Sequence, residues 1–437
     1  MNPTKSIKFT ILIVSTLLAF SATAYDFEVD GVCYDINQGN ESVIVSQISS
    51  LNGDVIIPKT VINKGKTYLV TSIGDLAFFG CIGLMDVTIP NSVTSIGDHA
   101  FSGCSGLTDV TIPNSVTSIG ECAFYGCSGL TDVTIPNSTI SIGNNAFEGC
   151  SGLTDLIIPN SITSIGLGAF DGCSGLTSIV VEKGNSNYDS RDDCNAIIET
   201  SSNTLVVGCK NTIFPNSVTS IDDYAFKGCS GLTDLTIPNS ITSIGLGAFD
   251  GCSGLTSIVV IKGNSNYDSR DDCNAIIETK IDRLSFGCKN TIIPNSVTSI
   301  DERAFFGCSD LGCVAIPNSI TAIYDNAYAC CTGLTSVAIP NSVMNIYENA
   351  FNDCDDLTSV TIGNSVTYIG NYSFSCKNLE KIYCNCAVPA EVRDNAFASV
   401  DYNTCILYVP KGSQKAYKDA SVWCNFVNIK EWEPDKK

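Results

Sequence analysis

The chain has 437 residues, with 45 acidic against 24 basic side chains, a formal net charge of −21 and a single histidine. A negative surplus of this size repels nucleic acid and anionic lipid, so neither is expected as a partner, and basic protein segments are favoured. One histidine leaves no second imidazole for a His-ligated metal or a His-based catalytic device, so we expect neither an enzyme nor a cofactor.

Residues 1–24 have the order of a secretory signal peptide. Lys5 and Lys8 form a short basic region, an apolar stretch covers 9–20, and a small-residue cleavage site ends at Ala24. A buried N-terminal helix is the alternative. The apolar stretch is too short to cross a bilayer and no later segment has 18 consecutive apolar residues, so no membrane span is expected. We therefore predict a secreted protein, extracellular or at the cell surface.

The chain after the signal peptide divides into a cap and a repeat array. Residues 25–71 lack the repeat and are predicted to form an N-terminal cap. Over 72–390 the chain repeats with a period of 23, in eleven units that begin at residues 72, 95, 118, 141, 164, 220, 243, 299, 322, 345 and 368. Self-similarity at a fixed period indicates the stacked coils of a solenoid.

The unit over residues 95–117 shows what one coil contains. Leu107, Val110 and Ile112 alternate in part with polar residues, which predicts a short strand with one buried face. The Pro-Asn pair after Ile112 ends this strand, and residues 116–119 are expected to form a second short strand on the far side. Because one unit buries too little apolar surface to fold alone, neighbouring units must share burial and both ends need caps.

Two units are each 33 residues longer than the others. Their inserts, at about 182–213 and 261–292, carry the same Asn-Tyr-Asp-Ser-Arg-Asp-Asp-Cys segment 79 residues apart, followed by two β-like runs. This pattern predicts one β-hairpin in each insert. The stems match, whereas the tips at 200–203 and 279–282 differ, either through drift or through adaptation to a ligand.

Each insert also contains an acidic run, at 189–193 and 268–272. Carboxylates at this density could bind Ca²⁺ weakly, but the run lacks the spacing of a calcium loop and has an arginine among the acids. A solvated turn with an internal Arg–Asp pair is the favoured interpretation.

The 23 cysteines fall into two groups. Eleven occupy one position of the repeat, from Cys81 to Cys376, where parallel side chains about 4.7–4.9 Å apart suit disulfide geometry poorly. We expect these to be buried free thiols. A hairpin centred on its tip would instead pair two cysteines in each insert, so the candidate disulfides are Cys194 with Cys209 and Cys273 with Cys288. The cysteines between 384 and 424 have no predicted pairing, and their spacing is unlike a zinc site.

Residues 391–437 follow the last unit and are predicted to form a C-terminal cap, with a short covering helix over 412–420. The array resembles the BspA-like (treponemal-type) leucine-rich repeat family. The residues that carry the resemblance recur in every unit and in the second unit are Ile96-Gly97, Ala100-Phe101, Gly103-Cys104, Leu107, Val110, Ile112-Pro113 and Ser115-Val116-Thr117. The tail that starts at Leu407 is also similar to an ending common in bacterial members.

The resemblance covers roughly residues 50–430 and implies a repeat solenoid. The expected fold is a curved, right-handed leucine-rich repeat coil with short parallel β-strands, capped at both ends and carrying two β-hairpin insertions. Members of the family are typically secreted or surface-exposed and are associated with adhesion to host matrix proteins or other cells. The resemblance brings no catalytic residues with it.

The outward positions of the predicted strands stack into two columns. One column holds aspartate and its neighbour threonine in the N-terminal units, so the candidate ligand-binding residues are Asp86, Asp109, Asp132, Asp155, Thr111 and Thr134. If these columns line the concave face, the carboxylates repel one another unless a cation or a basic ligand compensates. A solvated strip with screened charges is the alternative to a binding site for a basic segment of a partner.

The sequence therefore predicts a non-enzymatic binding protein. The leading hypothesis is an adhesin-like protein that contacts extracellular proteins, host matrix proteins among them, or other cells through the solenoid surface. The alternative is a structural or decoy ectodomain without a dedicated ligand.

Overall fold

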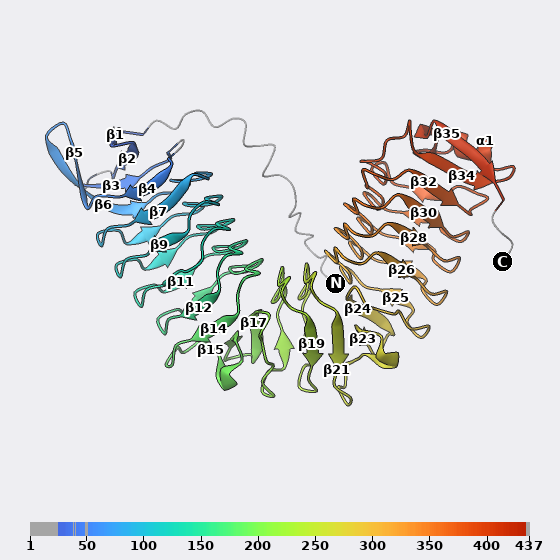
Figure 1. Cartoon of the computed structure of the whole chain (residues 1–437), viewed down its shortest axis with the longest axis horizontal. Helices are drawn as coiled ribbons and strands as arrows, with labels where there is room; N and C mark the ends of the chain where they lie inside the picture. The colour runs from blue at the N-terminus through green and yellow to red at the C-terminus, as the bar shows by residue number, and fades with distance from the viewer. Residues whose placement is uncertain (1–24, 38, 40, 49–50, 434–437) are drawn as a thin grey trace.

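The computed structural model describes residues 25–37, 39, 41–48 and 51–433. The predicted signal peptide lies outside the described residues. The described chain forms one arch of stacked coils (Figure 1) with almost no helix. Among the described residues, no helix is long and apolar enough to cross a membrane.

The stretch expected as the N-terminal cap consists of six strands at the start of the arch. They are β1 (Phe27–Val29), β2 (Val32–Ile36), β3 (Ser42–Val45), β4 (Gly53–Ile56), β5 (Thr60–Asn63) and β6 (Lys66–Ile73). The first three pair antiparallel, and β3 then pairs parallel with β6, which continues into the first coil. Buried Val43 and Val70 pack at this end, so these strands cover the apolar end of the array.

Each unit forms one coil, and the strands of successive coils build two columns of parallel strands. The coil that begins at Ser118 contributes only the bridge from Thr111 to Thr134 to the long-strand column. The long-strand column contains β7 (Leu84–Thr88), β9 (Asp109–Thr111), β12 (Asp155–Ile158), β14 (Ser178–Val181), β19 (Asp234–Ile237), β21 (Ser257–Val260), β26 (Cys313–Ala315), β28 (Ser336–Ala338), β30 (Ser359–Ile362) and β32 (Lys381–Cys384). The short-strand column contains β8 (Ser95–Ile96), β10 (Ser118–Ile119), β11 (Ser141–Ile142), β13 (Ser164–Ile165), β18 (Ser220–Ile221), β20 (Ser243–Ile244), β25 (Ser299–Ile300), β27 (Ala322–Ile323), β29 (Asn345–Ile346), β31 (Tyr368–Ile369) and β33 (Glu391–Val392). Equivalent residues pair from coil to coil, as Ser95 does with Ser118. The repeat solenoid predicted from the sequence is confirmed.

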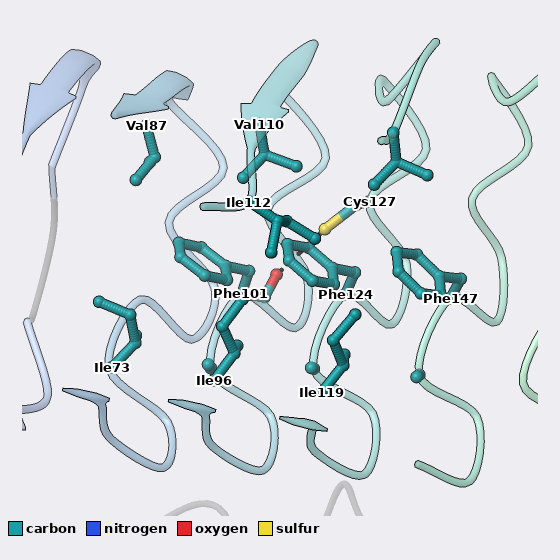
Figure 2. Packing of buried hydrophobic residues seen from close by; sticks show 14 of the residues in the cluster. Ile73, Val87, Ile96, Phe101, Val110, Ile112, Ile119, Phe124, Cys127 and Phe147 are labelled. Carbon is teal, nitrogen blue, oxygen red and sulfur yellow. Dashed lines mark hydrogen bonds between the residues drawn. The ribbon is translucent and has the colours of Figure 1, made fainter. Parts of the chain in front are cut away.

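A column of aromatic rings runs through the core (Figure 2). Phe101, Phe124 and Phe147 stack with neighbouring ring centroids 5.1 Å apart and nearly parallel planes. The stack extends from Phe78 to Phe170, and a second stack extends over Phe305, Tyr328, Phe351, Phe374 and Phe397. Each ring is covered by the rings of the adjacent coils, so a coil completes its core only when its neighbours are folded.

The cysteine column lies beside these rings, and its eleven thiols are buried and unlinked. In most coils the thiol donates a hydrogen bond to the carbonyl of the aromatic residue in the preceding coil, at 3.1 Å from Cys104 to Phe78. Figure 2 shows the Cys127 sulfur directed toward the preceding coil, where it bonds the Phe101 carbonyl at 3.1 Å. Burial raises the pKa of Cys104, so the thiol stays protonated and serves as a small buried donor, in agreement with the prediction of free thiols.

The inserts form the predicted hairpins. The first insert contains β15 (Tyr188–Asp189), the short 3-10 helix η1 (Arg191–Asp193), β16 (Ala196–Glu199) and β17 (Thr204–Gly208). The second insert contains β22 (Tyr267–Asp268), the 3-10 helix η2 (Arg270–Asp272), β23 (Ala275–Glu278) and β24 (Arg283–Gly287). The hairpins do not project from the solenoid, because β17 and β24 pair parallel with β18 and β25. The short-strand column ends at β13 and starts again inside the insert, and the buried apolar residues form three clusters that meet at the inserts.

One corner of the coil stays continuous across each insert. The Gly172 N–H donates to the Lys227 carbonyl at 2.8 Å, as equivalent glycines do in regular coils. Nearby, however, the Ala225 carbonyl accepts from Gly208 of the insert instead of from Phe170 of the preceding coil. The insert thus separates the two coils on one side only, and the arch bends where β15–β17 and β23–β24 lie, at the lower corners of Figure 1.

Gly208 makes this close approach possible. A Cβ at this position would lie 2.2 Å from the ring of Phe226, and a Cβ at Gly287 would lie 2.2 Å from the ring of Phe305. Only glycine lets the hairpin backbone sit directly on the aromatic column of the next coil.

The C-terminal end of the array is covered by β34 (Ile406–Pro410), α1 (Gln414–Asp419), η3 (Trp423–Asn425) and β35 (Asn428–Trp432). The strands continue the long-strand column in parallel, and α1 lies within the expected helix. The indole N–H of Trp423 donates to the Ala390 carbonyl at 3.0 Å, and the Tyr417 hydroxyl donates to the Cys386 carbonyl at 2.8 Å. These bonds tie the helical segment to the last coils.

The ring column predicts a large loss of stability when one ring is removed. Phe124→Ala removes a fully buried ring between two others and is expected to cost about 3–5 kcal/mol of unfolding free energy. Urea unfolding followed by circular dichroism measures this change. Tyr125→Ala is the matched control, because that neighbouring ring is 44% exposed and its loss should cost much less. Equal losses in the two variants would contradict the ring column as the main source of stability.

Candidate functional site

The candidate residues of the aspartate and threonine columns lie on the outer surface of the long-strand column. Asp109, Asp132 and Asp155 are exposed and Asp86 is half-buried. The acidic strip, defined as these four aspartates, has no ion-pair partner among the described residues. The structure therefore places these carboxylates on one surface and leaves their charge uncompensated by the chain.

The backbone pairing holds the strip in register. Asp86 pairs with Asp109, and Thr111 bridges to Thr134 in the next coil. Val110, between Asp109 and Thr111, is 2% exposed, so the strand side chains alternate between the core and the solvent as predicted. Strands therefore carry three of the four carboxylates, whereas Asp132 lies outside any strand, two residues before the bridge from Thr111 to Thr134.

The acidic runs of the inserts form turns with internal ion pairs. Arg191 pairs with Asp189 at 2.7 Å in the first insert, and Arg270 pairs with Asp268 at 2.8 Å and Asp282 at 2.6 Å in the second. This is the arrangement favoured from the sequence. In the described part of the chain, no group of three or more His, Cys, Asp or Glu side chains could hold a metal ion.

The disulfides predicted in the inserts do not form in the structure. Ala196 pairs with Gly208 across the hairpin, which sets Cys209 beside Asn195 rather than opposite Cys194. The register slips by one residue at an irregularity beside Ile197 and Ile198, as a β-bulge produces. The same slip occurs in the second insert, and all four cysteines are free and buried.

The insert thiols are instead bonded to the backbone. The Cys194 thiol donates to the Ala196 carbonyl at 3.7 Å, and the Cys209 thiol donates to the Asn195 carbonyl at 3.4 Å. Burial raises the pKa of Cys194 and of Cys273 to about 11. These thiols are therefore protonated and poorly reactive at neutral pH.

Alkylation tests this arrangement. Native protein treated with iodoacetamide at pH 8 is expected to react at the exposed thiols of Cys313 and Cys424. The buried insert thiols should react only after unfolding, because they are neither accessible nor ionised. Mass spectrometry of non-reduced peptides is the readout. A peptide pair linked through Cys194 and Cys209 would contradict the bulged register.

Sequence reasoning missed two clefts that the inserts create. The first cleft, of about 250 Å³, lies between the coil that begins at Ser164, the first insert and the coil that begins at Ser220, and is lined in part by Glu199, Asp222 and Lys227. The second cleft, of about 220 Å³, occupies the equivalent place beside the second insert and is lined in part by Glu278, Arg283 and Asp301. Their only sequence signal is the 79-residue offset that relates the two inserts.

Two further acids near the inserts, half-buried Asp171 and buried Asp250, form ion pairs with basic side chains of the chain. Asp171 pairs with Lys227 at 3.1 Å, and burial raises its pKa to about 6 although Lys227 opposes the shift. Asp250, at the equivalent place 79 residues later, pairs with Arg303. Burial raises the pKa of Asp250 to about 7 against the effect of Arg303. Each of these carboxylates is therefore paired with a cation from another coil of the solenoid.

A family model for the BspA type leucine-rich repeat region matches residues 71–192, 204–273 and 279–403, in six copies. The chain belongs to the BspA-type leucine-rich repeat family. The unmatched gaps inside the array fall within the two inserts, where the BspA-type coil is interrupted. The leucine-rich repeat solenoid is typically a non-enzymatic binding scaffold.

Solved structures of bacterial leucine-rich repeat proteins are similar to this BspA-type chain. A leucine-rich repeat protein from Bacteroides ovatus is 27% identical over 94% of this chain and 100% of its own, with a TM-score of 0.44. A leucine-rich cell surface protein from Faecalibacterium prausnitzii is 24% identical over 94% and 95%, with a TM-score of 0.43. The pneumococcal vaccine antigen PcpA is 17% identical over 93% and 98%, also with a TM-score of 0.43. No curated protein matches the chain.

Proposed function

We propose that this protein is a secreted or cell-surface binding protein, adhesin-like, that contacts host or matrix proteins or other cells through the surface of its solenoid. The acidic strip is the observation that supports this proposal most directly. Three of its four carboxylates are exposed, three stand on strands, and none has a cationic partner among the described residues. Membership of the BspA-type family agrees with a binding role.

The spacing of the coils gives the strip its affinity for positive charge. Side chains at equivalent positions of adjacent parallel strands are held about 4.7–4.9 Å apart. Two like charges at that distance repel by about 0.9 kcal/mol in bulk water, and by more beside a protein surface. A basic segment laid along the strip removes this repulsion and adds attraction of its own, which also steers the encounter.

The same surface becomes apolar beyond the strip. Ile157 and Val180 pair across β12 and β14 and are 56% and 46% exposed. They occupy the column in which the preceding coils carry Thr111 and Thr134. A partner segment that is basic at one end and apolar at the other fits this surface. Its basic end would pair with the acidic strip, and its apolar end would cover the exposed Ile157 and Val180 side chains.

The test replaces two central carboxylates of the strip. The double variant Asp109→Asn and Asp132→Asn is expected to bind immobilised fibronectin, laminin or collagen about three- to tenfold more weakly, because each lost charge contact contributes up to about 1 kcal/mol. Surface plasmon resonance at low and physiological salt measures the affinity. Thermal unfolding of the variant should be unchanged, since both side chains are exposed.

The matched control carries the same change of charge elsewhere. Glu121→Gln with Asp394→Asn removes two exposed carboxylates outside the strip and is expected to keep the binding of the unmodified protein. Equal weakening in both double variants would show a general effect of net charge and contradict a role for the strip. Failure of the folded, unmodified protein to bind any matrix protein or cell would favour a structural or decoy ectodomain.

A further inference from the structure

The two clefts beside the inserts are built on the same backbone but differ in charge. Each cleft is lined by a glutamate at the end of a hairpin strand and by an aspartate directly after a short-column strand. In the first cleft these are Glu199 of β16 and Asp222 after β18, and in the second they are Glu278 of β23 and Asp301 after β25. Glu199 pairs with Thr204 across the first hairpin, and Glu278 pairs with Arg283 across the second. The residue opposite the glutamate is therefore Thr204 in the first insert and Arg283 at the equivalent position of the second.

In the second cleft Arg283 lies between the two acids. Its Nη2 is 2.8 Å from Glu278 Oε1, and its Nε is 3.1 Å from Asp301 Oδ2. All three side chains are about one quarter to one third exposed. The second cleft therefore contains a guanidinium that donates a hydrogen bond to Glu278 and forms an ion pair with Asp301.

In the first cleft the same two carboxylates lack that cation. Neither Glu199 nor Asp222 has an ion-pair partner among the described residues; Glu199 accepts a hydrogen bond only from the nearby Ser202 hydroxyl, at 2.5 Å. Lys227, which lines the same cleft, is already paired with Asp171 and Glu148, both at 3.1 Å. The chain thus supplies no free cation for this pair of acids.

The first cleft also has more room. Phe286 in the second insert is 8% exposed and packs edge-on against Phe249, whereas the equivalent residue of the first insert is the smaller Val207. Asp222 is exposed, while Asp301 is half-buried beside Arg283. Partial burial raises the pKa of Asp222, and the charges of Asp223 and Glu199 raise it further, so a cation would relieve an existing repulsion.

We propose that the first cleft binds the guanidinium of an arginine side chain presented by a partner protein, in the place that Arg283 occupies in the second cleft. Glu199 and Asp222 accept from the guanidinium, and the aliphatic stem lies along Val206 and Val207, which line the cleft. This site is separate from the acidic strip and does not depend on the function proposed for it. The second cleft does not offer the same site because Arg283 already pairs with both of its carboxylates.

The test uses acetyl-arginine amide as the probe and exchanges the two differing residues. We expect the unmodified protein, residues 25–437, to bind one equivalent in isothermal titration calorimetry. Thr204→Arg should weaken this binding at least tenfold, because the introduced side chain takes the site. Arg283→Thr should create a second equivalent site, and the threonine is tolerated at this backbone position in the first insert. Circular dichroism checks that both variants are folded.

Two further probes identify the chemistry. Nα-acetyl-citrulline amide has nearly the same shape as the arginine probe but no charge. Nα-acetyl-lysine amide keeps a charged side chain but lacks the planar guanidinium. Both are expected to bind at least tenfold more weakly. Equal binding of citrulline or of lysine would overturn the assignment to a guanidinium. The proposal is also overturned if the folded protein shows no saturable binding of the arginine probe, or if Thr204→Arg leaves that binding unchanged.

Discussion

The structure depends on the contact between one coil and the next. A 23-residue coil is too thin to enclose a core, so its phenylalanine ring must be covered by the rings before and after it. The ring centroids of Phe101 and its neighbours at Phe78 and Phe124 are 4.9 and 5.1 Å away, close to the spacing of hydrogen-bonded parallel strands. Ring stacking, strand pairing and the thiol hydrogen bonds therefore repeat with one common spacing, and each supports the others.

The two inserts interrupt the stack of rings but leave the neighbouring coils in contact. Each leaves the glycine corner of the coil in contact with the next coil and places a hairpin strand on the opposite side, where Gly208 or Gly287 lies on an aromatic ring. The result is a bend in the arch, a core divided into three clusters and a cleft beside each hairpin. The features most unlike a regular solenoid are therefore also the places where a small ligand group fits.

The sequence predicted the parts that repeat. The buried positions, both strand columns, the free thiol column and the outward aspartates follow from a period of 23, because each residue has the same environment in every coil. The inserts were less predictable. The bulge beside Ile197 and Ile198 shifts the register by one residue, and such a shift turns a predicted Cys194–Cys209 pair into a mismatch. The clefts depend on how three separate segments pack, which a repeat pattern does not contain, so Thr204 and Arg283 gave no signal by themselves.

Removal of both inserts shows whether they bend the stack of coils. Deletion of residues 182–214 and 261–293 leaves two units of 23 residues with the same apolar pattern as their neighbours. Small-angle X-ray scattering of this shortened chain measures its overall shape. We expect a straighter solenoid, whose maximum dimension is retained or larger although 66 residues are gone. A shorter arch with the original curvature would contradict it, because the bend would then arise from the regular coils themselves.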